Sequence, residues 1–249
     1  MKLTLAEPRL LKESMNIISE LVNEVTLKVD QDKIEIIAID PANVAMIDFK
    51  LLSSAFVEYS VPKPQELAIN LEHLKVVLKR AKPVDTLTLE LDEEKNRLQV
   101  NFSGMSAKKF NIPLINIDEN EHKLPDLSFA TKVSLSSSIF DEAIEDMGVV
   151  AESVALVSSK ENFIVKCESN LRDAKVTMPS SEDVNIINDS AEEVFSKYSI
   201  EYLKKISKAS KLSDQVSLEF GPDYPLRAEY KLLDKLRLSF ILAPRVSSD

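Results

Sequence analysis

The chain repeats one pattern twice, with every matched position separated by 129 residues. The segment Val25–Ile36 alternates apolar and polar residues on either side of a polar turn, which predicts a two-stranded hairpin, and Val154–Val165 has the same pattern. A predicted amphipathic helix over Leu71–Lys82, followed by an alternating strand, has its counterpart in Ile200–Lys211 at the same spacing. A single register across separated segments restricts the fold to two copies of one domain.

The repeat includes identical residues in the second predicted helix of each copy and in the strand that follows it. The identical pairs are Glu72/Glu201, Leu74/Leu203, Lys75/Lys204, Lys79/Lys208, Lys82/Lys211, Asp85/Asp214, Leu89/Leu218 and Glu90/Glu219. Each copy is predicted to run strand, helix, three strands, helix, three strands, an α+β fold with two helices packed on largely antiparallel strands. We expect an N-terminal domain at 1–115, an acidic, turn-rich connector at 116–127 and a C-terminal domain at 128–249.

The composition excludes several classes of protein. Hydrophobic residues make up 44% of the 249 residues and charged residues 29%, a balance typical of folded globular chains. The longest apolar runs are far shorter than the roughly 20 residues that a membrane helix needs, so no membrane partner is expected. Cys167 is the single cysteine and has no intramolecular disulfide partner, which favours a reducing compartment.

The sequence lacks the motifs of common enzymes. With only Gly104, Gly148 and Gly221, the chain cannot build a glycine-rich phosphate loop or a dinucleotide-binding turn. His73 and His122 are isolated from other candidate ligands or bases, and we interpret both as surface residues. We therefore expect no catalytic residue, no metal site and no cofactor.

An acidic group in the first predicted helix of the second copy is the best candidate for a cation site. Asp141 and Glu145 are four residues apart and therefore share a helical face, with Glu142 and Asp146 beside them. A hard cation needs several more oxygen ligands than one such pair supplies. We interpret the group as a solvated acidic surface.

Positive charge is concentrated in two segments, although the formal net charge of the chain is −10. Lys75, Lys79 and Lys82 fall within a narrow arc at the helical period, and their counterparts 129 residues later occupy the same arc. Lysine contacts phosphates whatever the base sequence. Few aromatic residues interleave, so stacking on single-stranded bases is not expected. The pattern favours sequence-independent binding to the backbone of duplex DNA.

Three short motifs occur in a fixed order along the chain: Ile36–Val44 after the first hairpin, Asp223–Leu226, and Leu242–Val246 near the end. Together with the repeat, they resemble the DNA polymerase sliding clamps of the archaeal and eukaryotic type, the proliferating cell nuclear antigen family, and archaeal members most of all. The resemblance runs along essentially the whole chain. It implies one subunit of a trimeric ring with the DNA clamp fold, in which helices line the central hole and antiparallel sheets form the outside.

The same resemblance implies which residues contact DNA and neighbouring subunits. Duplex DNA would pass through the hole without sequence preference, beside Lys12, Lys75, Lys79, Lys82, Lys204, Lys205, Lys208 and Lys211. Identical or paralogous subunits would join by pairing the strand near Lys108–Pro113 with the strand near Ala174–Met178 of the next subunit. The implied interface residues are Lys108, Lys109, Phe110, Ile112, Lys175, Val176 and Met178.

The resemblance also implies a processivity factor of DNA replication and repair that has no catalysis of its own. A clamp loader would place the ring on DNA, and the ring would tether DNA polymerase, flap endonuclease and DNA ligase through short peptides that end in aromatic residues. Carried over position by position, the peptide-binding residues are Ile39, Val44, Leu124, Pro125, Pro225, Ile241, Ala243 and Pro244. An archaeal source would place the protein in the cytoplasm, and a eukaryotic source in the nucleus.

Three alternatives stay open at this point. A checkpoint-type clamp subunit shares the fold, but such chains tend to be longer and to lose the closing motif, which is intact here at Leu242–Arg245. A protein-only scaffold would not depend on its lysines, and an enzyme of duplicated α+β domains would need a polar pocket. The acids Asp141 and Glu145 depart from the family, whose corresponding helix carries basic residues. They allow either a different DNA path at this helix or a ring with more basic partner subunits.

Overall fold

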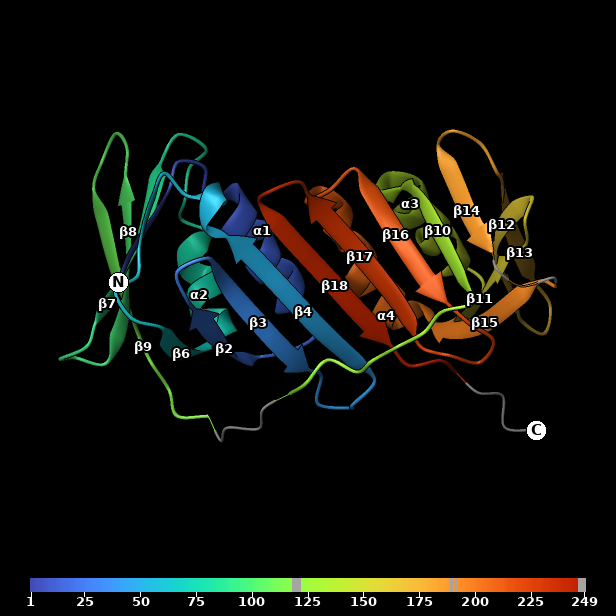
Figure 1. Ribbon diagram of the computed structural model, residues 1–249, viewed down its shortest axis with the longest axis horizontal. Helices are drawn as coiled ribbons and strands as arrows, with labels where there is room; N and C mark the ends of the chain where they lie inside the picture. Colours follow the sequence, from blue (N-terminus) through green and yellow to red (C-terminus); the bar gives the residue numbers. More distant parts are fainter. Residues whose placement is uncertain (118–121, 189, 191, 246–249) are drawn as a thin grey trace. The chain divides into compact units, whose positions relative to one another are not determined.

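The computed structural model describes residues 1–117, 122–188, 190 and 192–245, which divide into two compact units (Figure 1). Unit 1 comprises Met1–Pro41, Ile47–Leu124 and Leu232–Leu238. Unit 2 comprises Ala42–Met46, Pro125–Lys231 and Ser239–Asp249. Each unit therefore takes one short segment from the other half of the chain.

The same series of elements occurs in both halves of the chain. The first half runs β1 (Lys2–Leu5), α1 (Arg9–Ile18), β2 (Glu24–Val29), β3 (Lys33–Ile39), β4 (Ala45–Leu52), the 3-10 turn η1 (Ser53–Ala55), β5 (Glu58–Ser60), β6 (Gln65–Asn70), α2 (Leu71–Leu78), β7 (Thr86–Asp92), β8 (Arg97–Ser103) and β9 (Lys108–Pro113). The second half runs β10 (Thr131–Ser136), α3 (Ser137–Met147), β11 (Ser153–Ser158), β12 (Asn162–Glu168), β13 (Asp173–Pro179), β14 (Val184–Asn188), β15 (Val194–Ser199), α4 (Ile200–Ser207), the 3-10 turn η2 (Lys208–Lys211), β16 (Gln215–Phe220), β17 (Leu226–Leu232) and β18 (Leu236–Leu242).

Strand order also repeats. The first half has the order β5-β1-β7-β8-β9 and the order β6-β2-β3-β4, and the second half has β14-β10-β16-β17-β18 and β15-β11-β12-β13. The bounds of β2/β11, β3/β12, β6/β15, α2/α4 and β8/β17 match to the residue at the spacing of 129. Every strand of one half thus has a counterpart at the same place in the other, and the prediction of two similar α+β domains is confirmed.

Two details of the sequence-based prediction are wrong. Each half has five strands between its helices, not three; β5 has only three residues, and it pairs with β1 through distant partners such as Lys2 and Ser60. The helix predicted to reach Lys82 ends at Leu78, and the helix predicted to reach Lys211 ends at Ser207 and continues as the 3-10 turn η2. Pro83 disfavours a helix that reaches Lys82, because the residue before a proline is restricted away from the helical conformation.

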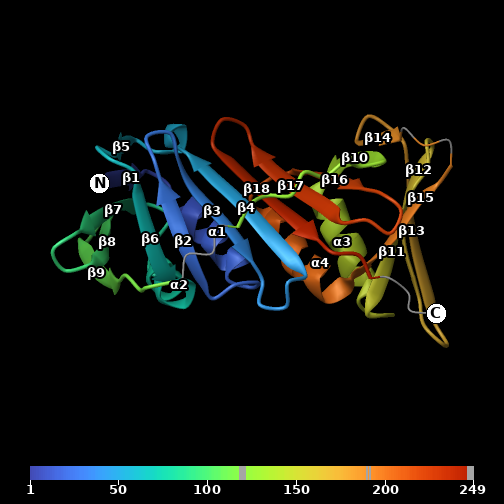
Figure 2. The ribbon, with the colours of Figure 1, turned by 60° about the horizontal axis from the view of Figure 1, so that its bottom comes forward.

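The helices of each unit pack together by their apolar faces. In unit 1, α1 packs on α2, and both lie on one face of β2 and β3 in the two views (Figures 1 and 2). Their buried apolar residues are Leu11, Met15, Ile17, Ile18, Leu71, Leu74 and Leu78. In unit 2, α3 packs on α4 and contacts β10, β12, β13 and β16. The opposite faces of the helices carry mostly polar side chains, together with exposed Val76 on α2 and Ile139 on α3.

In the parts of the chain that the structure describes, no helix is both long enough and apolar enough to cross a membrane.

Candidate functional site

The polar faces of α1 and α2 carry the candidate DNA-contacting lysines of unit 1. Lys12 lies on α1, Lys75 on α2, Lys79 at the C-terminal cap of α2, and Lys82 in the turn beyond it. The hydrogen bond from the His73 N–H to the Asn70 side chain, 3.2 Å long, fixes the start of α2. Lys12 and Lys82 line one hollow of about 340 Å³, so the structure brings these two predicted residues together.

Two of these lysines differ in their local partners. The Lys75 ammonium lies 2.9 Å from a carboxylate oxygen of Glu72, one turn earlier on α2, and this hydrogen bond lowers the pKa of Glu72 below its usual value. The more distant charge of Lys79 acts in the same direction. Lys79 and Lys82 are exposed, which suits side chains that contact phosphates.

In unit 2 both lysines of α4 are held by carboxylates. The Lys204 ammonium lies 2.8 Å from Glu145 on α3, and the Lys205 ammonium lies 2.9 Å from Glu201 one turn earlier. The Lys205 bond lowers the pKa of Glu201. Lys205 also lies 5.3 Å from the centre of the Tyr202 ring. The remaining two predicted lysines, Lys208 and Lys211, lie on the 3-10 turn η2.

The interpretation as a solvated acidic surface agrees with Glu145, whose side chain is 57% exposed, but not with Asp141. The Asp141 carboxylate is half-buried and accepts hydrogen bonds from the Ser207 hydroxyl at 2.5 Å and the Ser210 hydroxyl at 3.5 Å. Glu145 binds Lys204, and a Cβ at Gly148 would lie 2.2 Å from the Lys204 side chain, so a larger residue there would make the end of this side chain shift. Both carboxylates join α3 to α4. No described cluster of three or more His, Cys, Asp or Glu side chains could hold a metal ion.

Two arginines near the lysines of unit 1 were not part of the sequence-based prediction. Arg9 lies at the start of α1 and lines the hollow that contains Lys12 and Lys82. Arg80 is exposed directly after Lys79. The prediction selected mainly basic residues that recur in both copies, and the positions that match Arg9 and Arg80 in the second copy are Ser138 and Ala209. A count of basic residues around each predicted helix would have found them.

The predicted subunit-interface residues lie on two edge strands. Among the described strands, β9 ends the sheet of unit 1 after β8, and β13 ends the four-stranded sheet of unit 2 after β12. The outward edges of both are open to pair with another strand. Part of β9 is already engaged within unit 1: the Lys108 ammonium lies 3.0 Å from Asp85, and the Phe110 ring contacts Phe102. Met178 on β13 is buried in unit 2.

Most of the predicted peptide-binding residues belong to unit 2. Val44 and Ala243 are joined by a hydrogen bond from the Ala243 N–H to the Val44 carbonyl at 2.9 Å. Pro225, Ile241, Ala243 and Pro244 are half-buried, and Pro125 is exposed. Next to Pro225, the Tyr224 ring contacts Phe129 edge-on, and the Tyr224 carbonyl accepts a hydrogen bond from the Tyr198 hydroxyl at 2.7 Å.

The other two predicted peptide-binding residues belong to unit 1. Ile39 is half-buried at the end of β3, and the Leu124 side chain is 38% exposed. Residues 118–121 of the predicted connector and the tail from Val246 onward lie outside the described residues.

The repeated strand order, the paired helices and the open sheet edges define the class of DNA clamp proteins. The family models "Proliferating cell nuclear antigen, N-terminal domain" and "Proliferating cell nuclear antigen, C-terminal domain" match residues 1–122 and 123–245. The chain belongs to the proliferating cell nuclear antigen family.

Individual relatives agree with this assignment. The chain is 35% identical to the DNA polymerase sliding clamp of Pyrococcus furiosus over 92% of its own length and 91% of that protein's. It is 34% identical to the DNA polymerase sliding clamp of Nanoarchaeum equitans, with 98% and 99% covered. The crystal structure of PCNA from Thermococcus kodakaraensis superimposes with a TM-score of 0.92 at 26% identity, covering 98% of this chain and 99% of that one.

Proposed function

We propose that the protein is a DNA sliding clamp, a ring subunit that encircles duplex DNA and gives a replicative polymerase its processivity without catalysing a reaction. The matched lysines of the two helix pairs carry this proposal. In a chain with a net charge of −10, the basic side chains recur at the same places in both copies, on the helix faces that the apolar core leaves free. Such side chains bind phosphates of any sequence, as a protein that slides must do.

The two open edges support a ring built from copies or paralogues of this chain. Strand β9 of one subunit would extend the sheet that ends at β13 of the next, through residues Lys108–Ile112 and Lys175–Met178. Main-chain pairing of this kind covers both exposed edges at once. We propose a trimer. A native mass three times that of the 27.9 kDa chain would support it, and a stable monomer would count against it.

Stimulation of a polymerase on primed circular DNA tests the clamp itself. We expect Lys79→Ala with Lys208→Ala to reduce processive synthesis. The slope of log affinity against log salt should also become shallower by about 0.9 for each phosphate that is no longer neutralised. The matched control is Lys28→Ala with Lys132→Ala, which removes the same charge from β2 and β10. An equal loss in both double variants, or a preference for one DNA sequence, would contradict sliding on the backbone.

Partners are expected to bind through short peptides that end in aromatic residues, as clamp loaders, flap endonucleases and ligases of this class would. Half-buried Pro225, Ala243 and Pro244 support an apolar contact in unit 2, because proline stiffens the chain and lowers the ordering cost of binding. Ile39, Val44, Leu124, Pro125 and Ile241 complete the proposed set. Leu124→Ser with Pro244→Gly should weaken peptide binding and leave the native mass unchanged. Binding at the wild-type affinity would remove these residues from the site.

The proposed location is the cytoplasm of an archaeal cell, where a DNA clamp meets DNA directly.

A further inference from the structure

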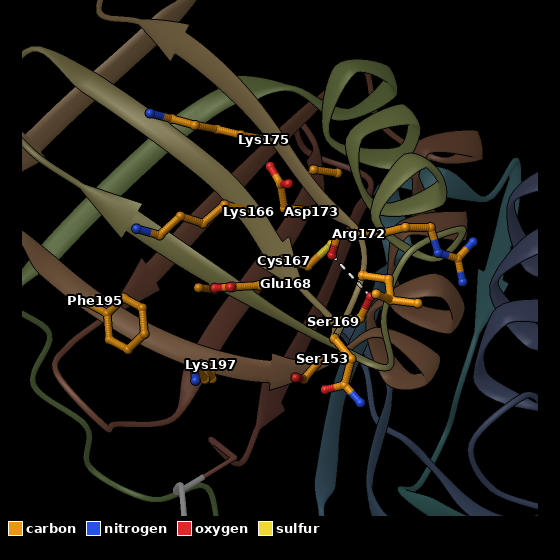
Figure 3. A pocket seen from close by; sticks show the side chains of 14 residues that line it. Ser153, Lys166, Cys167, Glu168, Ser169, Arg172, Asp173, Lys175, Phe195 and Lys197 are labelled. Carbon is orange, nitrogen blue, oxygen red and sulfur yellow. Dashed lines mark hydrogen bonds between the residues drawn. The ribbon is translucent and has the colours of Figure 1, made fainter.

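Three lysines form one row across a face of the four-stranded sheet in unit 2. Lys175 on β13 is opposite Lys166 on β12, Lys166 is opposite Ala155 on β11, and Ala155 is opposite Lys197 on β15. Lys166 and Lys197 alternate along their strands with buried residues such as Val165, so the lysines lie on the face turned away from α3. Figure 3 shows the Lys166 and Lys175 side chains extending side by side from neighbouring strands. We call Lys166, Lys175 and Lys197 the lysine row.

The lysine row does not stabilise the sheet. Like charges directly opposite each other on antiparallel strands are destabilising, and Lys166 and Lys175 are such a pair. Within the described part of the chain, no carboxylate oxygen lies within 4.0 Å of any ammonium group of the row. By contrast, the ammonium groups of Lys204 and Lys205 each have a carboxylate oxygen at less than 3 Å. An arrangement that places like charges side by side, with no ion pair to a described carboxylate, is suited to an anionic ligand.

The row borders a hollow that offers apolar contacts as well as charge. The hollow has a volume of about 770 Å³ and is lined by the row, by Phe195, and by the hairpin between β12 and β13. The Phe195 side chain is 37% exposed, with the Lys197 ammonium 6.0 Å from the centre of its ring. Leu171 at the hairpin tip is 95% exposed. A ligand at the row can therefore bury apolar side chains beside its anionic groups.

We propose that the lysine row binds an extended acidic segment of a partner protein. Four adjacent strands spaced about 4.8 Å apart make the row about 14 Å long, and acidic residues at positions i, i+2 and i+4 of an extended peptide span nearly the same length. Glu168 and Asp173, opposite each other in the adjacent cross-strand row, line the same hollow. Their carboxylates repel the closely spaced phosphates of a nucleic acid, whereas a peptide can place an uncharged or basic residue beside them.

A labelled twelve-residue peptide of alternating Asp and Thr is a suitable probe, measured by fluorescence anisotropy with the full-length protein and no DNA. Each exposed ion pair contributes about 0.2–1 kcal/mol, so Lys166→Gln with Lys197→Gln should raise the peptide Kd between about twofold and about thirtyfold. The matched control is Lys160→Gln with Lys132→Gln, which should leave the Kd unchanged. Lys160 lies in the turn between β11 and β12, and Lys132 on β10. The same peptide with Asn in place of Asp should not bind.

Further measurements separate this site from a folding defect and from the proposed clamp activity. The row variant should melt no lower than the wild type, because it removes a repulsive pair, and should stimulate the polymerase normally. The proposal is overturned if the row variant and the control variant bind the peptide equally, or if the Asn peptide binds as well as the Asp peptide. Tighter row-dependent binding of a twelve-nucleotide single strand than of the peptide would assign the row to nucleic acid. A native mass that changes in the row variant would assign it to contacts between copies of the chain. Both results would refute the proposal.

Discussion

The helix pairs of the two units have the same backbone plan but different charges. The pair in unit 1, with the turn after α2, has six basic side chains and two acidic ones: Arg9, Lys12, Lys75, Lys79, Arg80 and Lys82 against Glu13 and Glu72. The pair in unit 2, with η2, has four basic and five acidic: Lys204, Lys205, Lys208 and Lys211 against Asp141, Glu142, Glu145, Asp146 and Glu201. Lys12 corresponds to Asp141, and Asn16 to Glu145, at the spacing of 129.

The difference shows that matched residues of a duplicated domain can have different partners and therefore different roles. Lys75 and Lys204 are matched, yet Lys75 binds Glu72 within its own helix, whereas Lys204 reaches across to Glu145 on α3. Gly148 leaves room for this crossing, and the matched residue of unit 1 is Ser19. The helix pair of unit 1 therefore carries the larger net positive charge, and unit 2 uses Lys204 to join α4 to α3.

The largest expected effect tests whether the two copies share one core. Leu74→Ala and Leu203→Ala truncate matched leucines that are 1% and 0% exposed. Each should lower the free energy of unfolding by about 2–5 kcal/mol, because a buried cavity is added to the lost apolar burial. Urea denaturation of both variants provides the measurement. A cost well below this range for only one of them would show that the helix pairs are packed differently.

A smaller effect is expected at a matched pair of aspartates with different surroundings. Asp85 is buried, accepts the Lys82 N–H at 3.0 Å and binds the Lys108 ammonium at 3.0 Å, whereas Asp214 is exposed. Asp85→Asn should lower the melting temperature more than Asp214→Asn does. Equal effects would contradict the structural difference between these two turns.

The Asp85 carboxylate should also make the stability of the protein depend on pH. The Lys82 N–H and the Lys108 ammonium lower the pKa of Asp85 below its usual value. A carboxyl group whose pKa is lower in the folded state stabilises the fold above its unfolded pKa of about 3.9, and this contribution is lost as the pH falls through the folded pKa. The gap in melting temperature between wild type and Asp85→Asn should therefore be full at neutral pH and shrink in acid below the usual aspartate pKa. A gap that stays constant through this range would exclude the ionised carboxylate as its cause.

The smallest effect concerns the ion pair between α3 and α4. Lys204 and Glu145 side chains are 33% and 57% exposed, so a double-mutant cycle with Lys204→Gln and Glu145→Gln should give a coupling of about 0.2–1 kcal/mol. The matched double-mutant cycle with Lys75→Gln and Asn16→Ala should give no coupling energy. Glu145→Gln alone should also release Lys204 and steepen the salt dependence of DNA binding. An unchanged slope would show that Lys204 does not contact phosphate.

The sequence was sufficient to predict the repeat, because local alternation and helical periodicity are visible in each copy. It was insufficient for β5, whose three residues are a strand only through pairing with β1, more than 50 residues away. The location of Lys75 and Lys204 on the second helix of each unit was predictable for the same reason as the repeat, whereas Lys82 and Lys211 lie beyond the helices on which they were expected. The bond between Lys204 and Glu145 could not be predicted, because it joins residues 59 apart. The close passage of the Lys204 side chain beside Gly148 is visible only in the structure.

The open edges of β9 and β13 affect how free subunits assemble. If β9 of one copy pairs with β13 of the next, as proposed, the two edges differ and the pairing is head-to-tail. Such pairing closes into a ring only when the rotation between subunits divides a full turn. A change in this rotation would produce open filaments in place of rings. On this proposal, a substitution that changes the rotation between subunits would yield insoluble filaments even though each subunit folds correctly.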